Sequence, residues 1–404
     1  MPEAVIVAAG RSPIGRANKG SLVAFRPDDL AASVVSEVLA QVPQLEGQAV
    51  EDLILGCGLP GGEQGFNQAR VVALLAGLVD VPGVTLTRYC ASSLDAVRIA
   101  ANAIRAGEGE VFVAAGVECV SRYAKGTSDH IPGTQNPRFA GARARSAARA
   151  VENAGPWSAA EGLPDPFIPM GQTAENVAGM FAVTRRQQDE FALVSQQRAV
   201  AAQASGFWDH EIIPVTTPDG TVVTRDDGPR ADTSLDALCG LKPVFRPDGT
   251  VTAGNSCPLN DGAAAVVVMS DTRARRLGIE PLARVVAGAA SALNPEIMGL
   301  GPIEASRKAL GRAGVSMADI GLAEVNEAFA AQVLPVAWEL GIDVGRQLNQ
   351  FGGAIALGHP FGMTGVRILT TLLNGLRATG RSYGLETMCV AGGQGVAVVV
   401  ERLA

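Results

Sequence analysis

The sequence predicts a layered α/β protein whose sheet is mostly parallel. Short apolar runs rich in Val and Ala alternate with amphipathic patterns of helical period along most of the chain. The chain has 404 residues, 47% of them apolar, which is enough for two or three domains with buried cores. Aromatic residues make up 4% and charged residues 18%, and this composition suits tightly packed layers.

The individual elements follow from these patterns. Strands are expected at the apolar runs 5–9, 52–56, 111–116, 263–269, 282–290, 387–391 and 396–400. Amphipathic helices are expected at 28–39, 68–75, 92–105, 302–313 and 366–377. Prolines and acidic residues at 27–29 and 301–304 are typical of helix starts.

The segment 121–249 differs from the rest of the chain. It begins with six prolines between positions 132 and 169, and it has few strand-like runs. Its middle, 174–206, reads as one long helical stretch. About 50 residues without a regular pattern are typical of a lid or a binding loop. We therefore expect an insertion domain attached to one half of the α/β body.

The chain also repeats itself. Cys90 is followed seven residues later by Val-Arg-Ile at 97–99, and His359 is followed seven residues later by Val-Arg-Ile at 366–368. Each motif is followed by a helix, a glycine-containing turn and a strand. This order predicts two similar halves related by a pseudo-dyad, with both residues at helix starts. The free N–H groups and positive dipole end of a helix start favour thiolate or oxyanion chemistry.

Charge, targeting and cysteine usage exclude several classes. The net charge is −7 and the pI is about 5.2, so non-specific binding to nucleic acid or to anionic membranes is not expected. The N-terminus does not resemble a signal peptide and no apolar run is long enough for a membrane span, which favours the cytoplasm. Six cysteines without CxxC spacing and three histidines predict neither a metal site nor a disulfide framework.

Four residues are candidates for chemistry, and each also has a structural interpretation. Cys90 lies before an expected helix, and Cys389 lies at the end of an expected strand, next to a glycine-rich turn. Each is either a reactive thiol or a buried structural one. His359 is flanked by glycines, which permit close approach of a ligand. Asn326 is either a turn residue or a buried amide that needs a partner.

Several longer motifs resemble one family. They are Gly-Arg-Ser-Pro-Ile-Gly at 10–15, the Cys90 turn, Met-Gly-Gln-Thr-Ala-Glu-Asn at 170–176, Thr-Ala-Gly-Asn at 252–255, Asn-Asp-Gly-Ala-Ala at 260–264, Asn-Glu-Ala-Phe-Ala at 326–330, the Gly-His-Pro loop at 358–360 and the Cys389 loop. In this order they resemble the thiolases, acetyl-CoA acyltransferases, along nearly the whole chain.

The resemblance implies a fold and a reaction. The fold would have two similar α/β halves in five layers, α-β-α-β-α. The N-terminal half would comprise 1–120 and 250–272, the C-terminal half 273–404, and the inserted loop domain 121–249 would bind coenzyme A (CoA). The reaction would be the reversible thiolytic cleavage of 3-oxoacyl-CoA through an acyl-cysteine. CoA and acyl-CoA would be small-molecule substrates, with no resident cofactor or metal, in a homodimer or homotetramer.

The resemblance also assigns roles. Cys90 would be the nucleophile and His359 the base that activates it and later deprotonates CoA. Cys389 would be the acid and base for the α-carbon of acetyl-CoA. Asn326 would hold a water that forms one oxyanion hole with His359, and the backbone N–H groups of Cys90 and Ala391 would form the other.

Further positions are implied for the substrate pocket. Met170, Met298 and Phe329 would line the pantetheine and acyl region, unless they are ordinary core residues. Arg230 resembles an arginine near the CoA adenine. A basic cluster could meet the CoA phosphates or be a solvated face; it comprises Arg138, Arg143, Arg145 and Arg149.

The sequence departs from the family pattern at several of these positions. Ser93 and Ala391 stand where glycines are common, and Ala391 would strain the second oxyanion hole if it needs a positive φ. Cys257 and Ala237 stand where serines that contact CoA are common, so Cys257 would alter that contact. Pro169 replaces a histidine common in short-chain biosynthetic members, which favours a degradative or broader-chain enzyme.

Two alternatives remain at this point. One is a decarboxylating condensing enzyme of the ketoacyl-synthase type, which pairs the cysteine with two histidines or with histidine and asparagine; neither His130 nor His210 lies in a glycine-rich turn. The other is a non-catalytic acyl-CoA or lipid carrier with the same fold. The complete set of Cys90, Asn326, His359 and Cys389 favours the thiolase.

Overall fold

A computed structural model describes residues 2–45, 49–125, 136–151 and 155–404 of the chain. The main sheet has the strand order β10-β11-β12-β9-β1-β8-β5-β3-β4, and the short β2 (Gly15–Arg16) pairs with β8. Its first half comprises β1 (Ala4–Arg11), β3 (Asp52–Cys57), β4 (Gly83–Leu86), β5 (Val111–Cys119) and β8 (Asn260–Ser270). Its second half comprises β9 (Ala283–Ala292), β10 (Ile320–Val325), β11 (Tyr383–Val390) and β12 (Gln394–Arg402).

Strand directions correct one prediction. The β3–β4, β3–β5 and β10–β11 pairs are parallel, whereas the pairs made by β1, β8, β9 and β12 with their neighbours are antiparallel. The prediction of a mostly parallel sheet is therefore wrong. Helices cover both faces of β8 and β12, so these strands read as continuous apolar runs although they are antiparallel.

The two halves repeat the same topology, as the Val-Arg-Ile motifs predicted. When the strands of each half are numbered along the chain, the spatial order is 3-2-4-5-1 in both. In the C-terminal half a single parallel bridge, between Ala323 and Leu348, takes the place of the third strand. The halves join where β1 pairs with β9, at Val5 with Arg284 and Ile6 with Ala283.

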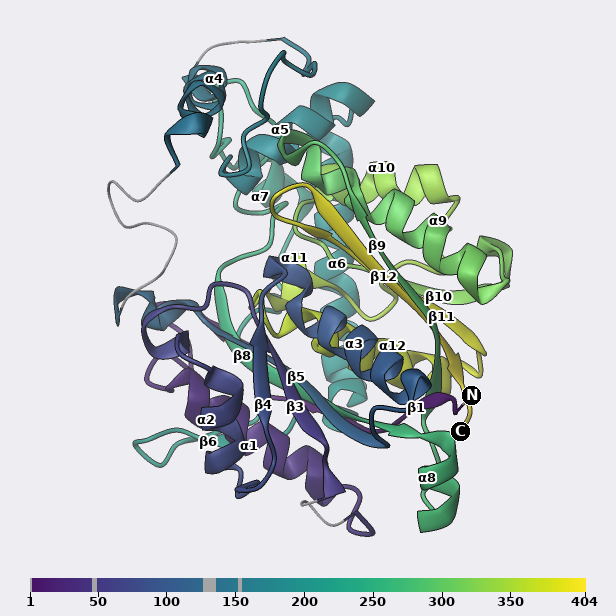
Figure 1. Cartoon of the computed structure of the whole chain (residues 1–404). Coiled ribbons are helices and arrows are strands. Elements are labelled where there is room, and N and C mark those ends of the chain that lie inside the picture. The colour runs from purple at the N-terminus through teal and green to yellow at the C-terminus, as the bar shows by residue number, and fades with distance from the viewer. Residues whose placement is uncertain (1, 46–48, 126–135, 152–154) are drawn as a thin grey trace.

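Three hydrophobic cores separate five layers, which confirms the expected arrangement (Figure 1). The first core lies between the N-terminal sheet and the helices α1 (Pro27–Ala40) and α2 (Gln68–Leu75). The second surrounds α3 (Ser92–Ala106) and α12 (Thr364–Thr379), which lie between the two halves of the sheet. The third lies between the C-terminal sheet and α9 (Gly301–Ala313) with α10 (Ala330–Leu340).

Smaller elements complete the fold. They are α4 (Ala140–Val151), α5 (Met170–Phe181), α6 (Arg185–Ala204), α7 (Leu235–Cys239), α8 (Asp271–Leu277), α11 (Ala354–Leu357), and the hairpin of β6 (Val215–Thr216) and β7 (Val222–Val223). Figure 1 shows α4 at the tip of a lobe that stands above the layered body. No helix within the described ranges has both the length and the apolar character needed to cross a membrane.

The helices of the inserted segment differ from the sequence prediction. The stretch expected to form one long helix forms two, α5 and α6, because Ala182 adopts a left-handed conformation with φ 51°. Thr184 then starts α6 with a capping box, in which its hydroxyl accepts the N–H of Gln187. Helix α4 lies in the part expected to lack regular structure, where its three arginines obscured its pattern.

Candidate active site

The starts of α3 and α12 lie against each other between the sheets. The N–H of Val366 donates to Oγ of Ser93 at 3.0 Å. A Cβ on Gly365 would collide with the backbone of Leu94, so this glycine permits the close crossing. Ser93, which stands where the family commonly has glycine, therefore joins the helix that follows Cys90 to the helix that follows His359.

Cys90 lies in a short 3-10 turn, Tyr89–Ala91, directly before α3. Tyr89 has φ 41°, and this turn lets the chain pass from β4 into the helix. Only 8% of the Cys90 surface is exposed, and the N–H of Ala391 donates to its sulfur. Burial raises the Cys90 pKa to about 12, although the Ala391 hydrogen bond opposes the shift. The resting residue is thus a thiol, because burial raises its pKa by more than the start of α3 lowers it.

His359 is buried and both ring nitrogens have partners. Nδ1 lies 2.7 Å from Oγ1 of Thr364, whose hydroxyl donates to the Pro360 carbonyl at 2.7 Å. The single hydroxyl proton is thus used, so Nδ1–H is the donor to Thr364 and Nε2 carries the lone pair. Nε2 accepts from Nδ2 of Asn326 at 3.2 Å. Burial, with a smaller effect of Arg367, lowers the His359 pKa to about 3, so the imidazole is neutral.

Asn326 follows β10 and is 1% exposed. Its backbone N–H donates to the Thr387 carbonyl on β11, and this bond fixes the position of the turn. Its Oδ1 atom is buried and has no hydrogen-bond partner among the described residues. Buried amide oxygens normally accept a hydrogen bond, so this atom can receive one from a water molecule or a ligand.

Cys389 and Ala391 lie on either side of the end of β11. Ala391 does not have a positive φ; the left-handed residues of this turn are Gly392 and Gly393, with φ 78° and 77°. Alanine therefore causes no backbone strain here, and its N–H is free to point at Cys90. Burial, followed by the proximity of Cys90 and Cys257, raises the pKa of Cys389 well above its usual value.

A cavity of about 250 Å³, the small cavity, opens at Cys90 and Ala391. Its remaining lining comes from the loops after β3, before Cys90, before α5 and after His359. These residues are Leu59, Tyr89, Pro166, Phe167, Ile168, Pro169, Met170 and Phe361. The Phe361 ring lies edge-on to His359 with centroids 5.1 Å apart, which ties the cavity wall to the imidazole.

A second cavity of about 570 Å³, the large cavity, lies between the inserted segment and the body. Three basic side chains, Arg16, Lys19 and Arg230, line it. Its apolar lining includes Leu238, Leu241, Ile355 and Ala356, and Ala237 also lies on its wall. Because residues 355 and 356 precede His359 by a few positions, the large cavity borders the loop that carries the imidazole.

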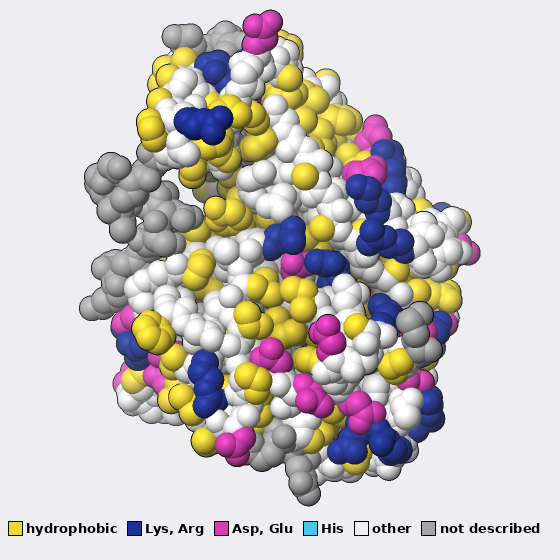
Figure 2. All heavy atoms as spheres, viewed as in Figure 1, with side chains coloured by type: hydrophobic (Ala, Val, Ile, Leu, Met, Phe, Trp, Pro, Cys, Tyr) yellow, Lys and Arg dark blue, Asp and Glu magenta, His cyan; other side chains and the backbone are white. Residues whose placement is uncertain are grey.

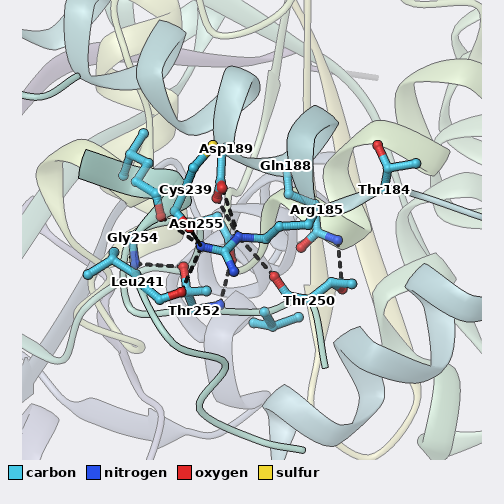
Figure 3. Close-up of polar contacts among 12 residues, drawn as sticks. Thr184, Arg185, Gln188, Asp189, Cys239, Leu241, Thr250, Thr252, Gly254 and Asn255 are labelled. Carbon is cyan, nitrogen blue, oxygen red and sulfur yellow. Dashed lines mark hydrogen bonds and ion pairs between the residues drawn. The ribbon is translucent and has the colours of Figure 1, made fainter. Parts of the chain in front are cut away.

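Arg185 braces the wall of the large cavity (Figure 3). Its Nη2 atom donates to the carbonyls of Leu238 at 2.7 Å and Leu241 at 2.9 Å, and also to that of Cys239. Its Nε atom pairs with Asp189 at 2.7 Å. Asp189 in turn accepts from Asn255 at 2.9 Å, which connects the Thr-Ala-Gly-Asn motif to the same wall.

The other candidates lie at varied distances from these cavities. Met298 and Phe329 are packed in the third core, and neither is among the residues that line the two cavities. Cys257 is half-buried, and its proximity contributes to the raised pKa of Cys389. The basic cluster lies on or beside α4, where Arg143, Arg145 and Arg149 donate to backbone carbonyls. His130 lies outside the described residues.

Several residues of the site were not found from the sequence. Thr364 orients His359, Arg185 holds α7 and Phe361 closes the small cavity. The Gly-His-Pro-Phe-Gly-Met-Thr order places Thr364 five residues after His359, near the helix start, and that spacing was the available signal. Among the described residues, no group of His, Cys, Asp or Glu is arranged to hold a metal ion.

Comparisons with known proteins identify the family. The family models for the thiolase N-terminal domain and the thiolase C-terminal domain match residues 4–272 and 279–402. The chain is 42% identical to a beta-ketoadipyl-CoA thiolase of Acinetobacter baylyi, covering 100% of both, and 42% identical to a 3-ketoacyl-CoA thiolase of Bacillus subtilis, covering 99% of this chain and 100% of the relative.

Structural similarity is equally extensive. The crystal structure of the Bacillus anthracis acetyl-CoA acetyltransferase superimposes with a TM-score of 0.86 at 38% identity, covering 100% of this chain and 99% of the other. Full-length matches at this identity, together with the shared fold, show that the chain belongs to the thiolase family of acyl-CoA C-acyltransferases.

Proposed function

We propose that the protein cleaves 3-oxoacyl-CoA with CoA, through an acyl group carried on Cys90, and that it can also run the reverse condensation. The observation that carries this proposal is the hydrogen-bonded chain from Thr364 through His359 to Asn326, next to a cavity that opens at Cys90. This arrangement places a neutral base, His359, near a buried thiol, Cys90, and leaves Oδ1 of Asn326 able to accept a hydrogen bond.

In the first half-reaction the Cys90 thiol gives its proton to Nε2 of His359. The sulfur attacks the 3-oxo carbon of the substrate, and the C2–C3 bond then breaks. Its electron pair passes to C2 of the departing acetyl-CoA enolate, which takes a proton from the Cys389 thiol. The proton held by His359 returns to the Cys389 thiolate, so the acyl-Cys90 enzyme is left with both groups neutral.

In the second half-reaction the thiol of CoA gives its proton to Nε2 of His359. The CoA sulfur attacks the thioester carbon, and the bond to Cys90 breaks. The Cys90 thiolate recovers the proton from His359, and the shortened acyl-CoA leaves. The low pKa of His359 favours this role, because the imidazole stays unprotonated between proton transfers.

Two sets of donors would stabilise the negative oxygens. The Ala391 N–H already points at the Cys90 sulfur, and with the Cys90 N–H it would face an oxygen attached to the bound carbon. The unpartnered Oδ1 of Asn326 would fix a water, which donates to the second oxygen beside His359. Each such donor is worth about 3–4 kcal/mol in the transition state.

The large cavity is the proposed binding site of CoA. It would be formed by the inserted loop domain, 121–249, packed against the N-terminal half, 1–120 with 250–272, and the C-terminal half, 273–404. Arg16, Lys19 and Arg230 supply positive charge for the phosphates and adenine, as expected for anionic ligands. Met170 reaches the small cavity, where it would contact the acyl end. Met298, Phe329 and Cys257 would shape the pocket indirectly, from the core behind it.

The relatives divide on substrate, since some act on beta-ketoadipyl-CoA and others on 3-ketoacyl-CoA. The thiolase reaction is common to both names. Membership of this family favours thiolysis over a decarboxylating condensation and over a non-catalytic carrier. The cysteine at position 389, in place of a second histidine, supports the same choice.

The proposal is tested by mixing the protein with acetoacetyl-CoA and CoA and following the loss of the 3-oxoacyl enolate absorbance. We expect turnover, and an acetyl group on the Cys90 peptide in mass spectra of enzyme quenched without CoA. Cys90→Ser should abolish both signals. A folded wild-type protein that turns over no 3-oxoacyl-CoA of any length, or that acquires its acyl group elsewhere, contradicts the proposal.

A homodimer or a homotetramer is part of the proposal. Strand β4 forms an edge of the sheet, and apolar side chains on and near it are exposed; they are Phe66, Leu74, Leu75, Val79 and Val84. An open edge with apolar neighbours favours pairing with a second copy. Light scattering should give two or four times the mass of 41.5 kDa, whereas a monomer at micromolar concentration would contradict this.

A further inference from the structure

The small cavity begins where the acyl group must be attached. Cys90 and Ala391 form part of its lining, and the rest comes from Leu59, from Tyr89 beside Cys90, from the segment 166–170 at the start of α5, and from Phe361 in the loop after His359. An acyl group bonded to the Cys90 sulfur therefore has this cavity as the space into which its chain can extend. The nature of the lining then decides which chains fit.

The side chains around this space are apolar or aromatic, and the hydroxyl of Tyr89 is the one side-chain oxygen in the described lining. They are Leu59, Tyr89, Phe167, Ile168, Met170 and Phe361, and Lys, Arg and His are absent from the described lining. Figure 2 shows hydrophobic side chains gathered where the upper lobe meets the body. A chain of methylene groups gains about 25 cal/mol for each Å² of surface that it buries against such walls.

Charged groups close to the cavity are already engaged. Arg88, which precedes Tyr89, pairs with Asp95 at 2.8 Å and donates to Gln394 at 2.8 Å. Asp165, which precedes the cavity segment, is 2% exposed and accepts the Phe167 N–H at 3.0 Å. The guanidinium of Arg88 is thus held by partners outside the cavity, and the carboxylate of Asp165 is fixed beside the wall.

The wall itself is held in place. The carboxylate of Glu296 accepts the N–H of Asp165 at 3.2 Å and the Nε1–H of Trp157 at 2.8 Å. The ring of Phe167 packs edge-on against Phe139 with centroids 5.7 Å apart. These contacts keep the apolar side chains facing the cavity, so a substrate meets a preformed surface.

Granted the acyl-Cys90 chemistry proposed above, we infer that the small cavity selects an uncharged, apolar acyl chain of short to medium length and discriminates against a chain that ends in a carboxylate. A terminal carboxylate would lose its hydration among these side chains and find no counter-ion, while Asp165 would repel it. A terminal methyl group has no such cost.

The direct experiment compares two substrates of equal length, 3-oxohexanoyl-CoA and 3-oxoadipyl-CoA, with acetoacetyl-CoA as the reference. We expect kcat/KM for thiolysis to be at least about tenfold higher for the hexanoyl substrate. Equal values, or a preference for the adipyl substrate, overturn the inference while leaving the proposed function intact. Failure of all three substrates with folded protein contradicts the proposed function instead.

A charge-introducing variant tests whether the cavity is the cause. Phe167→Arg places a cation in the wall at a side chain that is 47% exposed, so folding should tolerate it. We divide kcat/KM for 3-oxohexanoyl-CoA by kcat/KM for 3-oxoadipyl-CoA, with acetoacetyl-CoA as the reference substrate. We expect this ratio to fall at least about fivefold relative to wild type. The matched control Phe167→Gln is polar but uncharged and should not favour the adipyl substrate.

Leu59→Arg repeats the test from the loop after β3, in case the first variant is unstable in a thermal melt. If both arginine variants are folded and both keep the wild-type ratio, the chain end does not lie in this cavity and the inference fails. A ratio that shifts equally in Phe167→Arg and Phe167→Gln also contradicts it, because charge would then not be the determinant.

Discussion

The two halves of the molecule share one topology but differ in the connection between their fourth and fifth strands. In the N-terminal half β5 ends at Cys119 and β8 begins at Asn260, so the long segment between them builds the lobe and walls of both cavities. In the C-terminal half β11 ends at Val390 and β12 begins at Gln394, so a three-residue turn makes the same connection.

Under the proposed function, this difference places most of substrate recognition in one half and three of the four proposed catalytic side chains in the other. Asn326, His359 and Cys389 all belong to the C-terminal half: Asn326 follows β10, His359 lies between α11 and α12, and Cys389 lies near the end of β11. The N-terminal half contributes Cys90 and, through its long insertion, most of the cavity lining. A duplicated fold can thus keep most of its reacting groups in one copy while the other copy changes its loops to suit a substrate.

The sharpest test compares equivalent cysteines of the two halves. Val117 pairs with the last residue of β3 and Thr387 with the last residue of β10, so Cys119 and Cys389 each lie two residues further along. We expect Cys389→Ala to lower kcat for thiolysis by about 10²–10⁴, the usual range for a lost acid or base. Cys119→Ala should stay within about threefold of wild type, because only packing changes.

Steady-state kinetics and a thermal melt of each variant provide the measurement. A loss of activity by Cys119→Ala as large as that of Cys389→Ala, in a protein that melts normally, would show that the halves do not divide the work in this way. Normal activity of Cys389→Ala would remove the proposed acid and base.

Continuous apolar runs and 3.6-residue periods predicted the layered α/β fold and its amphipathic helices, because such patterns report burial directly. The repeat was predicted from the two Val-Arg-Ile motifs. The sequence pattern could not report strand direction, and it missed β4 and β10. Strand β4 has four residues, all half-buried or exposed, and therefore lacks the apolar signal. Strand β10 begins Ile-Gly-Leu-Ala, and its identity depends on pairing with β11.

The candidate site was predictable to a different extent. Cys90, Asn326, His359 and Cys389 were recognised through family motifs, whereas their contacts depend on where strands end in space. The 3.2 Å contact between Asn326 and His359 spans 33 residues, and the position of Asn326 depends on the hydrogen bond from its backbone N–H to Thr387 on β11. The sequence could not predict that Arg185 holds the wall of the large cavity either, because its three carbonyl partners lie more than 50 residues away.

The pH dependence tests the C-terminal half alone. The active form of His359 is the neutral imidazole, and burial lowers its pKa from 6.5 to about 3, so this form persists as the pH falls from 8 to 5. We expect kcat/KM for acetoacetyl-CoA to show no acid limb near pH 6.5. An ordinary imidazole would lose about 30-fold by pH 5, and a limb of that midpoint and depth would contradict the lowered pKa of His359.

A variant in the insertion tests the recognition half. Arg185→Lys keeps the charge that pairs with Asp189 but loses the fork that holds the carbonyls of Leu238 and Leu241. We expect KM for CoA to rise about fivefold to tenfold with kcat little changed, because the wall of the large cavity loosens. Initial rates at varied CoA concentration measure both constants.

The matched control is Arg186→Lys on the same helix. Its pair with Glu190 is exposed, with side-chain exposures of 72% and 47%, and it should leave both constants unchanged. If Arg185→Lys lowers kcat and leaves KM unaltered, the large cavity is not the seat of CoA.

The smallest expected effect lies at the contact between the halves. Ser93→Ala removes the acceptor of the Val366 N–H and leaves that group buried without a partner, which should lower the free energy of unfolding by about 1–3 kcal/mol. Urea unfolding measures this change. The matched variant Ser306→Ala removes a buried hydroxyl that has no partner among the described residues, and it should cost less. Equal costs would mean that the hydrogen bond between the halves adds nothing, and that the apolar crossing of α3 and α12 alone aligns Cys90 with His359.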